Sequence, residues 1–146
     1  MPDNTTTDFL PHTDEGLQKN HEIETAITRL QAQPSQQMLA HVLTVIRRQM
    51  QANAQLVVAV EPPAADQQLR LQAIKTDDGK QWWAAFTSFE EELKGGGSVM
   101  STFLADSKQL FTSALSVEEI EGVILNPWNC TLMLDKTLLR IILGLM

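Results

Sequence analysis

Cysteine is nearly absent from this chain, since Cys130 is the single one among 146 residues. No disulfide can form within the chain, and this suits a reducing compartment. Long apolar runs are also missing. A helix that crosses a bilayer needs about 20 apolar residues, whereas the longest candidate, residues 138–146, is interrupted by Arg140. Residues 1–16 are polar and acidic, without the apolar core of a signal peptide. We therefore expect a cytoplasmic protein with no membrane span.

Positive charge is scarce as well. Lys and Arg number 11 against 18 Asp and Glu, which leaves a net charge of −7. Binding to nucleic acid or to an anionic membrane needs clustered positive charge, so we expect neither. An acidic surface favours instead a basic partner protein, because opposite charge speeds their encounter. The composition, 43% hydrophobic and 20% charged, is typical of a globular protein, and the length fits one domain with a single core.

Recognisable catalytic and cofactor patterns are missing too. A nucleophile needs a base within hydrogen-bond reach, and the three histidines, His12, His21 and His41, have no sequence partners that suggest a triad. The glycines at residues 95–97 are not followed by the Gly-Lys-Ser/Thr of a phosphate-binding loop, so they predict a flexible linker. We expect no enzyme activity, no catalytic residue, no metal site and no cofactor.

The first third of the chain predicts a tail followed by two helices. Residues 1–18 are polar and bury little, so they are expected to be mobile. Asn20 is a plausible N-cap for a helix whose apolar residues recur at helical spacing. Residues 33–35 break this helix, and Ser35 is expected to cap a second one. On that second helix Gln49 is predicted to lie away from the apolar stripe.

The remainder of the chain predicts strands that alternate with short helices. Asp78-Gly79 carries the signal of a hairpin turn, and helices are expected to start at Ser88, at Asp106 or Ser107, and at Asp135. We predict an α/β (α+β) fold in a single domain over residues 19–146, with a mixed or antiparallel sheet of about four to six strands and helices mainly on one face. The predicted strands are residues 56–60, 69–74, 82–87, 99–104, 120–125 and 131–134.

The hydroxyls and acids around residue 88 allow more than one interpretation. Thr87 and Ser88 carry hydroxyl groups, but helix capping by Ser88 explains them better than nucleophilic catalysis. Glu90, Glu91 and Glu92 are adjacent, so they splay around a helix instead of converging on a metal ion. We expect solvated carboxylates at the positive end of a helix.

Aromatic residues supply the candidate binding surfaces. Trp82 and Trp83 are neighbours on a predicted strand, so they must point to opposite faces, one in the core and the other exposed or covered by a helix. Asn126-Pro127-Trp128 ends a strand, because proline has no amide hydrogen. This corner is either structural, with Asn126 bonded in the turn and Trp128 packed inward, or an anchor offered to a partner.

The order of these motifs resembles that of the SseB N-terminal-domain family. The resemblance covers roughly residues 20–144. Two pieces carry it, the Ala85–Ser88 run followed by acids and the run from Gly122 to Asn126-Pro127-Trp128. It implies a compact α/β domain whose mixed or antiparallel sheet is flanked by helices. It also implies a bacterial protein with no established enzymatic activity or cofactor.

These observations favour a non-enzymatic bacterial accessory domain that binds another protein. The alternative is a small-molecule sensor with a pocket lined by the Trp82/Trp83 strand and the Asn126–Trp128 corner. The apolar C-terminal helix is expected to be buried, or else to form the interface of a homo-oligomer. The candidate binding residues are Trp82, Trp83, Phe86, Thr87, Ser88, Asn126, Pro127 and Trp128.

Overall fold

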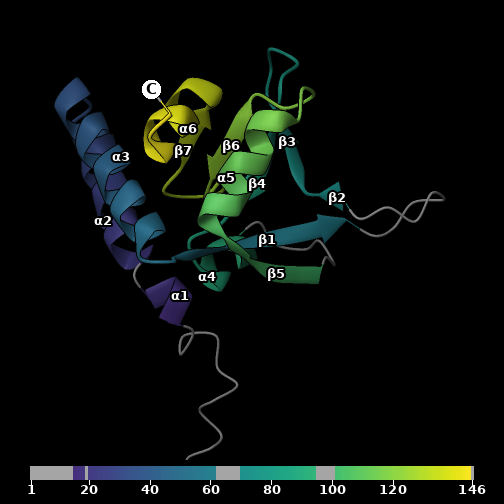
Figure 1. Cartoon of the computed structure of the whole chain (residues 1–146), viewed down its shortest axis with the longest axis horizontal. Helices are drawn as coiled ribbons and strands as arrows, with labels where there is room; N and C mark the ends of the chain where they lie inside the picture. Colours follow the sequence, from purple (N-terminus) through teal and green to yellow (C-terminus); the bar gives the residue numbers. More distant parts are fainter. Residues whose placement is uncertain (1–14, 19, 62–69, 95–100, 146) are drawn as a thin grey trace, which may run out of the picture.

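The computed structural model describes residues 15–18, 20–61, 70–94 and 101–145, and the statements below concern these residues. They form six helices and seven strands, an α+β fold that confirms the predicted class (Figure 1). The helices are α1 (Glu15–Gln18), α2 (Asn20–Ala32), α3 (Gln36–Gln51), α4 (Phe89–Leu93), α5 (Ser107–Ser116) and α6 (Lys136–Leu143). The strands are β1 (Gln55–Glu61), β2 (Arg70–Leu71), β3 (Ala73–Lys75), β4 (Gln81–Ala85), β5 (Ser101–Asp106), β6 (Gly122–Leu125) and β7 (Leu132–Asp135).

The strands divide between two sheets instead of forming one. An antiparallel sheet has the order β2-β1-β5, and a mixed sheet has the order β3-β4-β6-β7 with β4 and β6 parallel. The sheets meet at Val57 and Phe86, whose backbone groups exchange two hydrogen bonds of 2.8 Å. The predicted strand 69–74 is shared between them, because β2 pairs with β1 while β3 pairs with β4. Gln72 lies between β2 and β3 and bonds through its backbone to both sheets.

Local signals in the sequence set where several elements begin and turn. Three predicted N-caps are confirmed, and Asp106 is the cap where the sequence left Asp106 and Ser107 open. Each of the four side chains accepts a hydrogen bond from the backbone N–H three residues ahead. The predicted hairpin between β3 and β4 is also confirmed. Its Gly79 has a φ of 87°, a conformation that glycine adopts without a steric penalty. The four caps are Ser35 for α3, Ser88 for α4, Asp106 for α5 and Asp135 for α6.

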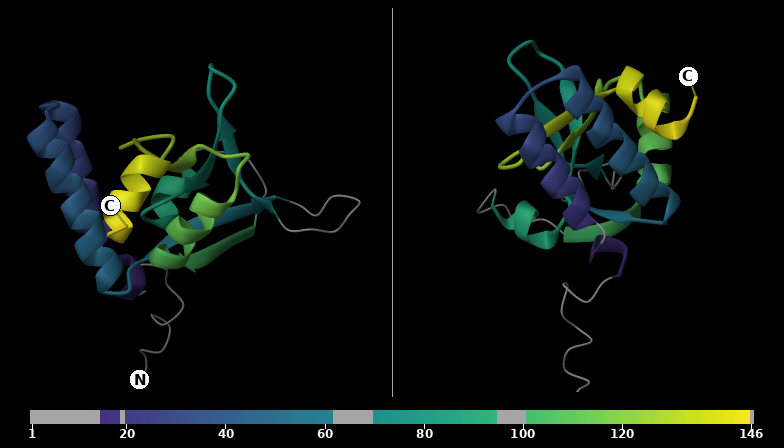
Figure 2. Two further views of the ribbon diagram at one scale, coloured as in Figure 1. Left: turned by 45° about the horizontal axis from the view of Figure 1, so that its top comes forward. Right: turned by 90° about the vertical axis from the view of Figure 1, so that its left-hand side faces the viewer.

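Two apolar cores lie on opposite faces of the mixed sheet. The larger core joins β6 residue Val123 to α2, α3, α5 and α6, and the smaller core contains the next residue, Ile124, with Trp82 and Phe86. Leu17 of α1 belongs to the smaller core, and α4 packs against it as well. The longer helices therefore cover one face, as predicted. Figure 2 shows α2 and α3 side by side along that flank of the domain.

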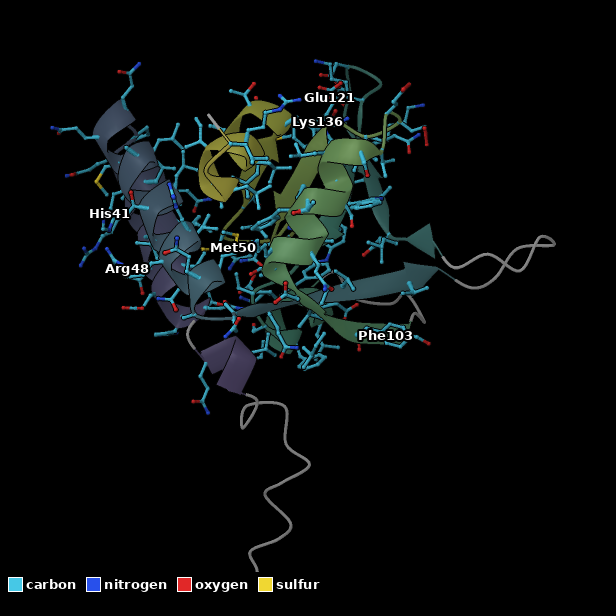
Figure 3. All side chains as sticks on the ribbon, in the orientation of Figure 1. His41, Arg48, Met50, Phe103, Glu121 and Lys136 are labelled. Carbon is cyan, nitrogen blue, oxygen red and sulfur yellow. The ribbon has the colours of Figure 1, made fainter. Side chains whose placement is uncertain are left out.

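The packing of α3 corrects one prediction. Met50 turns toward the core, whereas His41 and Arg48 lie on the outer side of the helix (Figure 3). Gln49, predicted on the polar side, is instead buried. Its side-chain amide donates a hydrogen bond to the Glu22 carboxylate of α2. The position faces α2, and the bond to Glu22 compensates for the burial of a polar group.

The last residues of the predicted mobile tail form a helix. Residues 15–18 form α1 instead of remaining free, and Leu17 is buried. The remainder of the tail lies outside the described residues, as do the glycines at 95–97 and the start of the predicted strand 99–104. Over the described part of the chain, no helix combines the length and apolarity needed to cross a membrane.

The C-terminal helix closes the larger core. Leu139 and Ile142 of α6 are fully buried there, as expected of a closing helix. Ile141 and Leu145 are 40% and 64% exposed. The homo-oligomer interface stays a prediction.

We predict that Gly122→Ala destabilises the domain by about 3 kcal/mol, because overpacking a closed site forces the backbone apart. A Cβ atom at Gly122 would lie 2.0 Å from the carbonyl oxygen of Leu134, on the neighbouring strand β7. Gly79→Ala is the matched control, since nothing lies within 4 Å of its added Cβ. It costs only about 1 kcal/mol, from its positive φ. Urea unfolding measures both, and equal losses would contradict the close approach of β6 and β7.

Candidate functional site

An acidic cleft lies between α2 and α4. It has a volume of about 430 Å³, and its wall carries three carboxylates, from Glu24, Glu90 and Glu91. A side hollow of about 500 Å³ adjoins it and shares His21, Glu24 and Glu91. α1 and α4 each form part of the cleft wall, and both contact β1 near its start (Figure 1). The cleft is lined by Leu17, Gln18, His21, Glu24, Thr87, Ser88, Phe89, Glu90 and Glu91, and the side hollow adds Thr25, Thr28, Arg29, Asn129 and Cys130.

Asn126 ties the ends of two parallel strands together beneath the acidic cleft. It is fully buried and has a φ of 51°, a left-handed conformation that asparagine tolerates better than most residues. Its side-chain oxygen accepts a hydrogen bond of 2.9 Å from the Thr87 amide. Its backbone N–H donates to the backbone carbonyl of Ala85 at 2.8 Å. The end of β6 is thereby fixed against the residues that follow β4.

Glu24 is oriented by this buried pair. Asn126 donates from its side-chain nitrogen to the Thr87 hydroxyl at 3.0 Å, and that hydroxyl in turn donates to the Glu24 carboxylate. The other carboxylate oxygen lies 3.4 Å from Nδ1 of His21, one turn earlier on α2. Both oxygens of Glu24 therefore have partners, and its side chain is held at the cleft wall.

Asn20 plays a different part from the one predicted. It is not an N-cap but the first residue of α2, and it is fully buried. Its side-chain nitrogen donates to the backbone carbonyls of Gln55 and Thr87, at 2.6 and 3.1 Å. Its side-chain oxygen has no partner among the described residues. The Asn20 side chain thus makes long-range bonds to β1 and to Thr87 in place of a local cap.

Glu91 also departs from the prediction of three solvated acids. Glu90 is exposed, but Glu91 is only 7% exposed. One of its oxygens, Oε2, lies 2.7 Å from Nζ of Lys94, a side chain that is 45% exposed. The other oxygen, Oε1, is buried and has no partner among the described residues. The hydrogen bond to Glu91 is the main reason why the pKa of Lys94 lies above its ordinary value.

Glu91 and Glu24 both act on Cys130 in the side hollow. Burial raises the pKa of the Cys130 thiol, a hydrogen bond with Thr28 opposes this rise, and the charges of Glu91 and Glu24 add to it. Negative charge from α2 and α4 therefore converges at the side hollow. Among the described residues, no group of three or more His, Cys, Asp or Glu side chains could hold a metal ion.

Comparison with known proteins identifies the family. The family model of the SseB protein N-terminal domain matches residues 23–140. The chain belongs to this family. The resemblance inferred from the Ala85–Ser88 and Gly122–Trp128 runs is thereby confirmed. No match was found among curated proteins or among solved structures.

The tryptophans of this SseB domain take three different positions. Trp82 is buried in the smaller core, and Trp83 packs at the edge of the larger one, so the predicted alternation is confirmed. Trp83 also lines a separate groove of about 310 Å³ beside α5. Trp128 is 41% exposed, so of the two alternatives for this corner the inward packing of Trp128 is wrong. It lies in the turn held by Asn126, which leaves its ring outside both cores.

The other predicted site residues divide between structure and cleft. Phe86 is fully buried. Thr87 and Ser88 line the acidic cleft, and the Ser88 hydroxyl oxygen caps α4 by accepting from the Glu91 amide at 3.2 Å. Pro127 is partly exposed beside Trp128. The parts of the postulated small-molecule pocket are thus spread over the buried core, the groove beside α5 and the exposed turn.

Three residues of the cleft were missed at the level of sequence. No sequence motif marks His21 and Glu24 as site residues, because they approach α4 only in the tertiary fold. A motif does mark Glu91. Ser88 and Glu91 have the Ser-x-x-Glu spacing of a capping box. The Ser88 hydroxyl oxygen accepts from the Glu91 amide, whereas the Glu91 carboxylate pairs with Lys94. That spacing separates Glu91 from Glu90 and Glu92.

We predict that Asn126→Gly destabilises the SseB domain by about 2 kcal/mol, because it leaves the buried backbone amide of Thr87 without its hydrogen-bond acceptor. Asn126→Ala removes the same bonds and also places a non-glycine residue at positive φ, which adds about 1 kcal/mol. Urea unfolding of both variants separates the side-chain bonds from the backbone conformation. A neutral Asn126→Gly variant would show that the bond to Thr87 contributes nothing.

We predict that Cys130 is alkylated by iodoacetamide more slowly than an unstructured cysteine peptide near neutral pH. The thiolate is the reactive form, and a raised pKa moves the rise in rate to higher pH. Glu91→Gln removes the larger carboxylate contribution and should shift that profile back toward lower pH. Glu119→Gln, an exposed acid outside the cleft wall, is the control and should leave it unchanged. A profile identical to that of the free peptide would contradict the described surroundings.

Proposed function

We propose that this SseB domain is a non-enzymatic protein-binding module that takes a basic segment of a partner protein in the acidic cleft. The observation that carries the proposal is the buried Glu91, which lines both the cleft and the side hollow and has one carboxylate oxygen without a partner among the described residues. A charged group is costly to bury without full pairing. A cation from a partner would supply the missing pairing.

The charge of the walls supports a basic ligand. Glu24, Glu90 and Glu91 bring three carboxylates to the cleft, and the side hollow contributes one guanidinium, that of Arg29. The whole chain carries a net charge of −7. Complementary charge of this kind raises association rates and rejects acidic partners.

The shape of the site favours an extended segment over an enclosed small ligand. Small-molecule sites usually bury most of the ligand's surface. Here two adjoining hollows share one wall and both open to solvent. A peptide that follows them passes His21, Glu24 and Glu91 in the middle of its path.

Exposed apolar residues lie beside the two hollows. Leu93 is 71% exposed and follows Phe89 by one turn of α4, on the side of that helix that lines the cleft. Trp128 immediately precedes Asn129 and Cys130, which line the side hollow. Exposed leucine and tryptophan beside a polar site are typical of a surface that a protein partner covers.

The proposal predicts that a blocked decapeptide of alternating lysine and glycine binds at the cleft. In a titration followed by amide NMR shifts, the largest changes should fall on residues 18, 21–24, 87–91 and 129–130. Glu24→Gln/Glu91→Gln should weaken binding about tenfold, which corresponds to ~1.4 kcal/mol. The affinity should fall with added salt, because the contact is electrostatic.

The matched control is Glu118→Gln/Glu119→Gln, which removes the same charge from two exposed positions outside the cleft wall. It should bind the peptide nearly as well as the unmodified domain. Equal weakening by both double variants would mean that net charge alone attracts the peptide. Shifts concentrated at the groove beside α5 would move the binding surface there, and either outcome contradicts the proposal.

A further inference from the structure

Glu91 presents two oxygens in unlike states. Oε2 is occupied by the ammonium group of Lys94 at 2.7 Å. Oε1 is buried and unpaired among the described residues. The glutamate is more than nine-tenths buried, although it lines the acidic cleft and the side hollow. One oxygen of this buried carboxylate therefore lacks a partner, while Lys94 occupies the other.

The occupied oxygen restricts which cation can use the free one. A guanidinium binds a carboxylate best through two parallel N–H bonds, one to each oxygen. Lys94 blocks that arrangement by holding Oε2. A primary ammonium is a compact point charge with three rotatable donors, so it can bond to a single oxygen. Neighbouring carboxylates also lower the cost of a second cation, since Glu24 and Glu90 act on Lys94 together with Glu91.

We propose that the acidic cleft selects a primary ammonium group, supplied by a lysine of the partner segment, over a guanidinium. Glu91 Oε1 is the anchor, and Lys94 is the residue that determines the specificity. Oε1 is closed to solvent in the unbound domain. A partial rotation of the carboxyl group about its terminal side-chain torsion, which is soft in glutamate, opens it to the ligand, and the half-exposed Lys94 side chain follows Oε2 during that rotation. This inference rests on the proposed function, because it names the group that the cleft recognises in its basic partner.

The test compares two blocked decapeptides of equal charge, one alternating lysine with glycine and the other arginine with glycine. Isothermal titration calorimetry at low salt measures both against the unmodified domain. We expect the lysine peptide to bind about fivefold more tightly, the effect of one charge-assisted hydrogen bond that the guanidinium cannot form well. The lysine peptide with acetylated side chains should not bind, because acetylation removes the ammonium charge.

Lys94→Met provides the decisive variant, because Lys94 is exposed and its removal frees Oε2. The arginine peptide should then gain affinity by the two-bond arrangement, and the lysine preference should disappear. Lys80→Met is the matched control. The Lys80 side chain is 52% exposed, and its Nζ lies 3.9 Å from Oε2 of Glu121, away from the cleft wall. Replacing Lys80 therefore changes the net charge by the same amount as replacing Lys94. The lysine-to-arginine affinity ratio of Lys80→Met should equal that of the unmodified domain.

The possible outcomes separate this inference from the proposed function. The inference that Lys94 determines the specificity is wrong if both peptides bind the unmodified domain equally. It is also wrong if Lys94→Met and Lys80→Met change the lysine-to-arginine affinity ratio alike. In both cases the proposal that the acidic cleft binds basic segments stands. If neither peptide binds, both proposals are overturned. Thermal melting of each variant verifies that it is folded. Glu91→Gln, which keeps the shape of the side chain, should also abolish the lysine preference.

Discussion

The hydrogen bond from the Thr87 amide to the buried side chain of Asn126 is the interaction on which the rest of the site depends. It links the end of β6 to the residue that follows Phe86 after β4. Asn126 also donates to the Thr87 hydroxyl, which in turn donates to the Glu24 carboxylate. Asn20 binds the Thr87 carbonyl from the start of α2. One buried threonine thus connects two strands, a helix and the cleft wall, in a setting where an unpaired polar group would be costly.

The two inner carboxylates of the cleft are stabilised in different ways. Glu24 has partners on both oxygens, one of them internal and one at the surface. Glu91 is paired on one side only, with Lys94. Burying a charge seldom stabilises a fold by itself. A half-paired carboxylate that borders an open hollow is therefore easier to explain by binding than by folding, and this difference underlies both proposals.

Much of the fold was predictable because its signals are local. Ser35 and Ser88 cap their helices through bonds that span three residues, and Asp78-Gly79 specifies a hairpin within five. The site was less predictable. Asn126 was recognised as a turn residue, but its bond to Thr87 spans 39 positions. For Trp128 the sequence left inward packing and exposure open, because the orientation of a side chain after a turn depends on what packs around it.

The sequence by itself determined the family, the fold class, four of the helix starts and the acidic character of the chain. Capping geometry, hydrophobic periodicity and net charge act within a few residues or over the whole composition. Only the tertiary structure decided that the strands divide between two sheets, that Glu91 is buried while Glu90 is exposed, and that α2 and α4 face one cleft. These features arise where segments distant in the chain pack together, and the burial of each polar group depends on the partner it meets there.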